Sequence, residues 1–175
     1  MTVPRPTRLV LLGTLALTAG IVVLFGALLA RGEPISARFA GSFLLVLLLL
    51  FALRVVGQIL VVLRAPEWLP PMESGQWNLM PYRLLLPIQL AFLGLMTWLV
   101  AGFLAERGVA VEPRPTWGWF LIVVSGIYAG AMAVRYVVRM RRRADQRWLG
   151  GTIPIFFHWV LASFLFVLGS YHASH

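Results

Sequence analysis

The stretch GSFLLVLLLLFALRVVGQILVVL, from Gly41 to Leu63, is apolar except for a few residues, and its charged residue is Arg54. About 20 residues of α-helix, at ~1.5 Å per residue, cross the hydrocarbon core of a bilayer. The stretch is therefore long enough to predict a transmembrane helix. Arg54, and Gln58 one helical turn later, are then polar side chains inside a membrane, and their presence there needs a reason.

Four other stretches have the same length and apolar character, and the whole chain shares the bias. Of its residues 60% are hydrophobic and 12% are charged, and the mean hydropathy is +0.86. Soluble domains carry about a quarter charged residues. The sequence predicts an all-α polytopic membrane protein, a single domain over residues 1–175 built as a bundle of five transmembrane helices. The expected spans are residues 9–30, 39–63, 84–105, 117–138 and 153–171.

The arginines predict how the bundle is oriented. With five spans, the N-terminus and the loops at 64–83 and 139–152 share one side, which holds nine of the fifteen basic residues. The other side holds four, Arg31, Arg38, Arg107 and Arg114. Cytoplasmic loops carry the excess of Lys and Arg. We therefore expect the N-terminus in the cytoplasm and the C-terminus outside, in the inner (plasma) membrane of a bacterium.

The net charge of +9 suggests nucleic acid at first sight. The arginines, however, flank the helices and do not form an extended basic domain. Such a placement is typical of topology determinants and of contacts with anionic lipids. We expect membrane lipids as partners and no nucleic acid.

Polar residues of four spans fall in the same, cytoplasmic half of the membrane. A charge near the bilayer centre costs at least ~2.5 kcal/mol, so such residues face the bundle interior and are often functional. The sequence predicts a basic ligand-binding pocket formed by Arg54, Gln58, Gln89, Arg135 and His158. In the outer half we expect only Tyr128, Thr97 and small hydroxyl side chains.

The loop APEWLPPMESGQWNLMPYR, from Ala65 to Arg83, is expected to be ordered at the membrane interface and to cover this pocket. Its candidate residues are Glu67, Trp68, Glu73, Trp77, Tyr82 and Arg83. Two alternatives stay open: the tryptophans only anchor the loop, or Glu67 or Glu73 neutralises Arg54 for purely structural reasons. The string PEWLPP resembles the Pro/Trp-rich loop of the tryptophan-rich sensory protein (translocator) family. There the motif follows the first helix, whereas here it follows the second, so no family is assigned.

Groups for chemistry are scarce. The chain has no cysteine and no lysine, and among the spans only the rim of the third carries a carboxylate, Glu106. Without a carboxylate pair or a Ser/His/Asp set we expect no enzyme activity, no metal and no cofactor. One alternative is haem b. His158 and His172 are fourteen residues apart, which is similar to the ligand spacing of membrane di-haem cytochromes b, and a symmetric dimer would have to complete both sites.

The fourth span contains GIYAG, a G-x-x-x-G motif at Gly126 and Gly130 that predicts close helix packing. The partner helix belongs either to the same chain or to a second copy in a homodimer or larger complex. The expected function is that of a small membrane binding or accessory protein that holds a lipid, a quinone or a partner subunit. The alternatives are a b-type haem or quinone-linked electron-transfer subunit and a small transporter or channel subunit.

Overall fold

The computed structural model describes residues 5–64, 82–142 and 153–175. These residues form five α-helices: α1 (Arg5–Arg31), α2 (Ala37–Arg64), α3 (Tyr82–Ala105), α4 (Pro115–Arg142) and α5 (Ile153–Ala173). All five are long and apolar enough to cross a membrane. The prediction of an all-α chain with five such helices is confirmed. Each helix contains one expected span. Helices α1 and α4 continue for about another turn, because flanking arginines such as Arg139 and Arg142 are good helix formers too.

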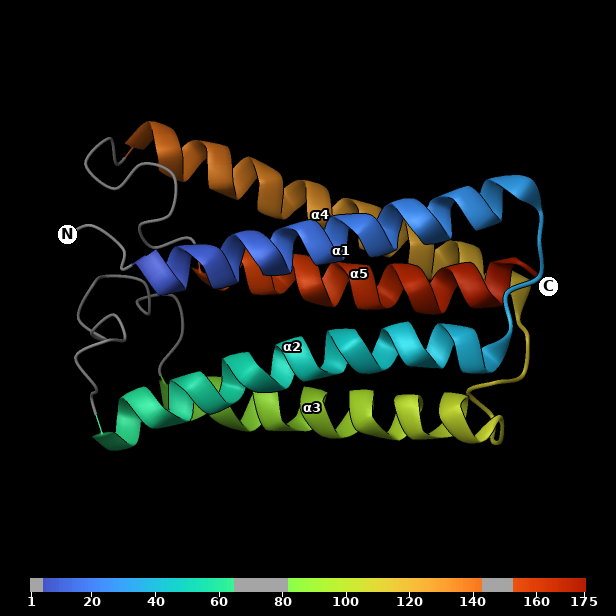
Figure 1. Cartoon of the computed structure of the whole chain (residues 1–175), viewed down its shortest axis with the longest axis horizontal. Coiled ribbons are helices and arrows are strands. Elements are labelled where there is room, and N and C mark those ends of the chain that lie inside the picture. The colour runs from blue at the N-terminus through green and yellow to red at the C-terminus, as the bar shows by residue number, and fades with distance from the viewer. Residues whose placement is uncertain (1–4, 65–81, 143–152) are drawn as a thin grey trace.

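The helices run alternately up and down with roughly parallel axes (Figure 1). The arginine-rich end is the end where α2 stops at Arg64 and α4 stops at Arg142, on the left of Figure 1. The opposite end is the C-terminal end, where α5 finishes at Ala173. This alternation places the five predicted pocket residues nearer the arginine-rich end: Arg54, Gln58, Gln89, Arg135 and His158.

Helix α5 is the centre of the bundle. It packs against α1, α2 and α4, while α3 has backbone contacts only with α2 among the described helices. Two-thirds of the α5 span (67%) is buried inside the protein, compared with 6% of the α4 span. The polar residues of α5 therefore meet neighbouring helices, whereas most of α4 faces outward.

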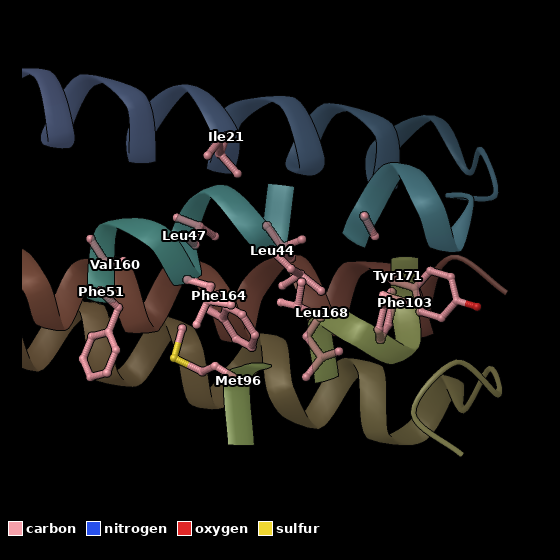
Figure 2. Packing of buried hydrophobic residues seen from close by; sticks show 14 of the residues in the cluster. Ile21, Leu44, Leu47, Phe51, Met96, Phe103, Val160, Phe164, Leu168 and Tyr171 are labelled. Carbon is pink, nitrogen blue, oxygen red and sulfur yellow. The ribbon is translucent and has the colours of Figure 1, made fainter. Parts of the chain in front are cut away.

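The core is a layer of aliphatic and aromatic side chains between α2, α5 and α3 (Figure 2). Leu44, Leu47 and Phe51 of α2 recur every three or four residues and so lie on one face of the helix. They pack in one cluster with Phe164 of α5 and Met96 of α3. Large apolar side chains such as those of α4 remain exposed on the outside, which suits a surface that faces lipid tails.

Two glycines lie where α4 and α5 approach each other closely. A Cβ on Gly118 of α4 would lie 2.4 Å from the main-chain N of Ala173 and 2.8 Å from the carbonyl O of Gly169. A Cβ on Gly169 of α5 would lie 2.9 Å from the Gly118 carbonyl. Because no side chain fits there, these two glycines let the backbones of α4 and α5 touch at the C-terminal end.

The C-terminal end is tied together by polar contacts from α5. The Tyr171 hydroxyl donates to the carbonyl of Val111 at 2.6 Å, which holds the α3–α4 connection. The Ser174 hydroxyl accepts from the main-chain N–H of Ile35 at 3.1 Å, which holds the α1–α2 connection. Arg38 and Glu106 form an exposed ion pair at 2.9 Å. These contacts hold the two helix connections against the C-terminal end of α5.

Candidate functional site

Arg54 lies on α2 and is half-buried. Its guanidinium carbon is 5.6 Å from the centre of the Phe157 ring on α5. A cation over an aromatic face is attracted by the ring quadrupole, and the attraction is stronger where water is absent. The side chain of Arg54 is therefore directed at the central helix of the bundle.

Gln58 follows Arg54 by one helical turn and lies on the same side of α2. It continues the buried stripe of Phe51 and Val55 and is only 2% exposed. Neither Nε2 nor Oε1 of its amide makes a hydrogen bond within the described part of the chain. A buried polar group without a partner costs about 1–3 kcal/mol. Packing alone would favour leucine at this position.

His158 of α5 is hydrogen-bonded to a residue of α4. Its Nδ1 atom lies 2.6 Å from the hydroxyl of Tyr128. If the hydroxyl donates, the imidazole keeps its proton on Nε2 and presents a second donor there. The neighbouring Trp159 donates from Nε1 to the carbonyl of Ala129 at 3.2 Å. Ser125 donates to the carbonyl of Ala162 at 2.8 Å. Polar contacts thus fix the rotation of α5 against α4.

Tyr128, which was expected apart from the predicted pocket, contacts one of its residues, His158. Fourteen residues of α4 follow Tyr128, whereas only five residues of α5 precede His158, yet the two side chains are bonded. Helix α4 extends beyond the start of α5 at the arginine-rich end (Figure 1). Depth counted from the end of one helix therefore does not transfer to its neighbour.

Arg135 supplies a second positive charge from α4, seven residues after Tyr128 and on the same face of the helix. It is half-buried. Tyr128 and His158 are bonded between α4 and α5, and Arg54 of α2 reaches α5 at Phe157, the residue before His158. Arg135 and Gln58 lie on the same helix faces as Tyr128 and Arg54, respectively. We call the following five residues the polar cluster: Arg54, Gln58, Tyr128, Arg135 and His158.

Gln89 is not brought to this cluster by any described contact. It is half-buried on α3, a helix whose backbone packs against α2 and not against α4 or α5. Four other predicted residues, Glu67, Trp68, Glu73 and Trp77, lie outside the described residues. Tyr82 and Arg83 start α3, and their side chains are likewise not described. The covering loop and the structural pairing of Arg54 stay predictions.

His172 lies far from His158, at the C-terminal end of α5. It is buried, and its ring packs at 5.2 Å from that of Tyr171 and at 6.3 Å from that of Phe103. Within residues 5–64, 82–142 and 153–175, no three His, Cys, Asp or Glu residues group as metal ligands. The structure leaves the haem alternative untested.

Gly126 and Gly130 are exposed, and a Cβ on either would meet no atom within 4 Å. They do not pack against another described helix of this chain. The glycines that allow close helix packing are Gly118 and Gly169. A G-x-x-x-G motif does not predict this contact, because the contact uses one glycine from each helix. The sequence analysis did not assign Phe157 to the site, and it placed Tyr128 outside the predicted pocket. The signal for Tyr128 was its spacing of seven residues from Arg135.

Comparisons with protein-family models, with curated proteins and with solved structures found no match for the chain. The polar cluster is therefore the main guide to its function. It offers two guanidinium groups, a buried amide and a Tyr–His pair, at the arginine-rich end of an apolar bundle. Such a set can hold and orient a ligand rich in oxygen acceptors.

Proposed function

We propose that this protein is a multi-pass membrane protein that binds the polar headgroup of an amphipathic ligand, a lipid or a quinone, at its polar cluster. It acts as a binding or accessory protein without a reaction of its own. The observation that carries the proposal is Gln58, whose buried amide has no hydrogen-bond partner in the described protein and adjoins Arg54. The cost of that amide is offset when a ligand supplies the partner.

The surroundings of the cluster suit a molecule with one polar end. Leu53 and Val56 flank Arg54 on α2 and are more than half exposed. Val134 and Val137 flank Arg135 on α4 and are 65% and 46% exposed. An acyl or isoprenoid chain can lie along these exposed side chains while its headgroup reaches the buried donors. Ligand sites are commonly apolar with a few convergent polar groups.

The proposal includes a location. The distribution of arginines favours a plasma membrane with the N-terminus in the cytoplasm. The polar cluster then lies in the cytoplasmic half of the bilayer, where acidic lipids give the leaflet its negative surface potential.

The test is the mass of what stays bound to the purified protein. The wild type, Arg54→Gln and Arg38→Gln are extracted in a mild detergent and compared by native mass spectrometry. Arg38 is the matched control, because it lies on the same helix, is exposed, and is ion-paired at the C-terminal end. We expect one bound amphiphile on the wild type and on Arg38→Gln, and its loss from Arg54→Gln.

Two results would contradict the proposal. One is a wild type that carries no defined ligand beyond the bulk lipid mixture. The other is equal retention by Arg54→Gln and the wild type. A Soret absorbance band in the same preparation would instead support the haem-linked alternative through His158.

A further inference from the structure

We propose that His172 is a pH-sensitive switch, which releases the α3–α4 and α1–α2 connections from the end of α5 when its imidazole takes up a proton. The switch belongs to the C-terminal end of the bundle and works without a ligand at the polar cluster. Three observations support it: the burial of the ring, the unpartnered Nδ1 atom, and the hydrogen bonds made by the same turn of α5.

The imidazole of His172 lies in an apolar place between helices. It is 8% exposed, and its Nδ1 atom has no hydrogen-bond partner in the described part of the chain. The ring of Phe103 from α3 lies against it, with the centroids 6.3 Å apart, and so does the ring of Tyr171 at 5.2 Å. The next residue, Ala173, lies where the main chain of α5 touches Gly118 of α4. Three helices therefore enclose the ring.

The charged and titratable side chains around His172 are exposed. They come from each element at this end and are Arg31, Glu33, Arg38, Glu106, Arg107, Glu112, Arg114 and His175. Two of the carboxylates are paired with arginines, Glu106 with Arg38 and Glu112 with Arg114. None of the carboxylates accepts a hydrogen bond from Nδ1 of His172. A proton on Nδ1 would therefore be a buried donor, on a charged ring, without an acceptor.

A proton on this imidazole favours an open form of the C-terminal end. Histidine ordinarily gains its proton near pH 6.5, within the physiological range. Burial of the charged form costs free energy unless an acceptor or an opposite charge compensates it. In an open form the ring reaches water and takes up the proton without that cost. The closed form is therefore favoured above about pH 6.5 and is lost progressively as the pH falls below this value.

The last turn of α5 connects His172 to both helix connections. Tyr171 donates to the carbonyl of Val111, which lies in the α3–α4 connection, at 2.6 Å. Ser174 accepts from the main-chain N–H of Ile35, which lies in the α1–α2 connection, at 3.1 Å. Both residues are within two positions of His172, so a movement that takes the ring to water displaces both hydrogen bonds. With the orientation proposed above, this end meets the pH of the surroundings outside the cell.

The experiment measures amide hydrogen exchange of the full-length protein in detergent, by mass spectrometry, at pH 7.5 and at pH 5. Peptides over residues 106–118 and 32–38 report the two connections, and a peptide over residues 44–51 reports the core. A histidine that titrates near 6.5 only in the open form raises the opening constant by up to about thirtyfold between these pH values. We expect the exchange of the connections in the wild type, relative to His172→Gln at the same pH, to rise by about tenfold or more.

Two further variants locate the switch. His175→Gln is the matched control, because His175 is an exposed histidine of the same turn and its Nδ1 lies 3.0 Å from the Tyr171 carbonyl. It should keep the pH response of the wild type. His172→Phe keeps an aromatic ring in the site without a titratable group and should lose the response as His172→Gln does. It keeps the test decisive if His172→Gln does not fold.

Three results would overturn the switch. One is an equal ratio of exchange between wild type and His172→Gln at both pH values, because a purely structural role of the imidazole acts equally at both. Another is loss of the pH response in His175→Gln, which assigns the proton to His175. The third is exchange at pH 5 that rises as much in the core peptide as in the connections, because this indicates acid unfolding of the whole bundle. This third comparison needs only the wild type.

Discussion

At the scale of single residues, Gln58 is expected to lower the stability of the fold and to strengthen the binding of the ligand. Its amide is buried without a partner in the described protein, which costs about 1–3 kcal/mol. Gln58→Leu replaces the amide by an apolar side chain of similar size. We expect the delipidated variant to have a higher Tm than the wild type and a weaker hold on its ligand. Thermal unfolding and native mass spectrometry of one preparation measure both.

Gln89→Leu is the matched control for this substitution. Gln89 is half-buried on α3 and no described contact connects it to the polar cluster. Gln89→Leu should change ligand retention and Tm less than Gln58→Leu does. A lower Tm in Gln58→Leu would show that the amide stabilises the fold, and Gln58 would then lose its place in the proposed site.

Substitutions of two tyrosines distinguish an effect on ligand binding from the loss of a stabilising hydrogen bond. Tyr128→Phe removes the 2.6 Å contact with His158, and Tyr171→Phe removes the 2.6 Å contact with the Val111 carbonyl. Each should lower the free energy of unfolding by about 1 kcal/mol. Only Tyr128→Phe should also weaken ligand retention, because only Tyr128 orients a donor of the polar cluster. Equal retention by the two variants would remove the Tyr–His pair from the site.

At the scale of helices, the close contact of α4 with α5 depends on Gly118 and Gly169 and not on the G-x-x-x-G motif. In Gly118→Ala the new Cβ would meet main-chain atoms of α5 at 2.4 and 2.8 Å. Backbone cannot move aside as a side chain can, and overpacking typically costs about 1–3 kcal/mol. We expect a clear loss of thermal stability, measured as Tm in detergent.

Gly126→Ala is the control on the same helix, since its Cβ would meet nothing within 4 Å. Its Tm should equal that of the wild type. A large loss in Gly126→Ala would show that this exposed face packs against another molecule. It would then support the homodimer expected from Gly126 and Gly130.

The helices themselves could be predicted from the sequence because length and hydropathy are properties of each segment alone. The shared face of Arg54 and Gln58 also followed from helical spacing. What failed depends on two helices at once. The contact of Tyr128 with His158 depends on how far α4 extends past α5, and the contact of Gly118 with Gly169 depends on rotation. Hydropathy fixes neither, because stagger and rotation come from packing between neighbours.

At the scale of the whole molecule, the two ends of the bundle differ in their chemistry. The C-terminal end holds the described ion pairs, Arg38 with Glu106 and Arg114 with Glu112. The other end holds the polar cluster and the helix ends at Arg64 and Arg142. An excess of arginine at one end favours its retention in the cytoplasm. The leaflet that supplies the ligand therefore depends on the orientation of the bundle.

The orientation can be measured directly because the chain contains no cysteine. Glu33→Cys places a thiol at the C-terminal end, and Arg142→Cys places one at the end of α4. Both positions are exposed in the structure. With the N-terminus in the cytoplasm, a membrane-impermeant maleimide should label Glu33→Cys in intact cells and Arg142→Cys only after permeabilisation. The reverse pattern would put the polar cluster in the outer leaflet, where a lipid ligand would have to be drawn from a different pool.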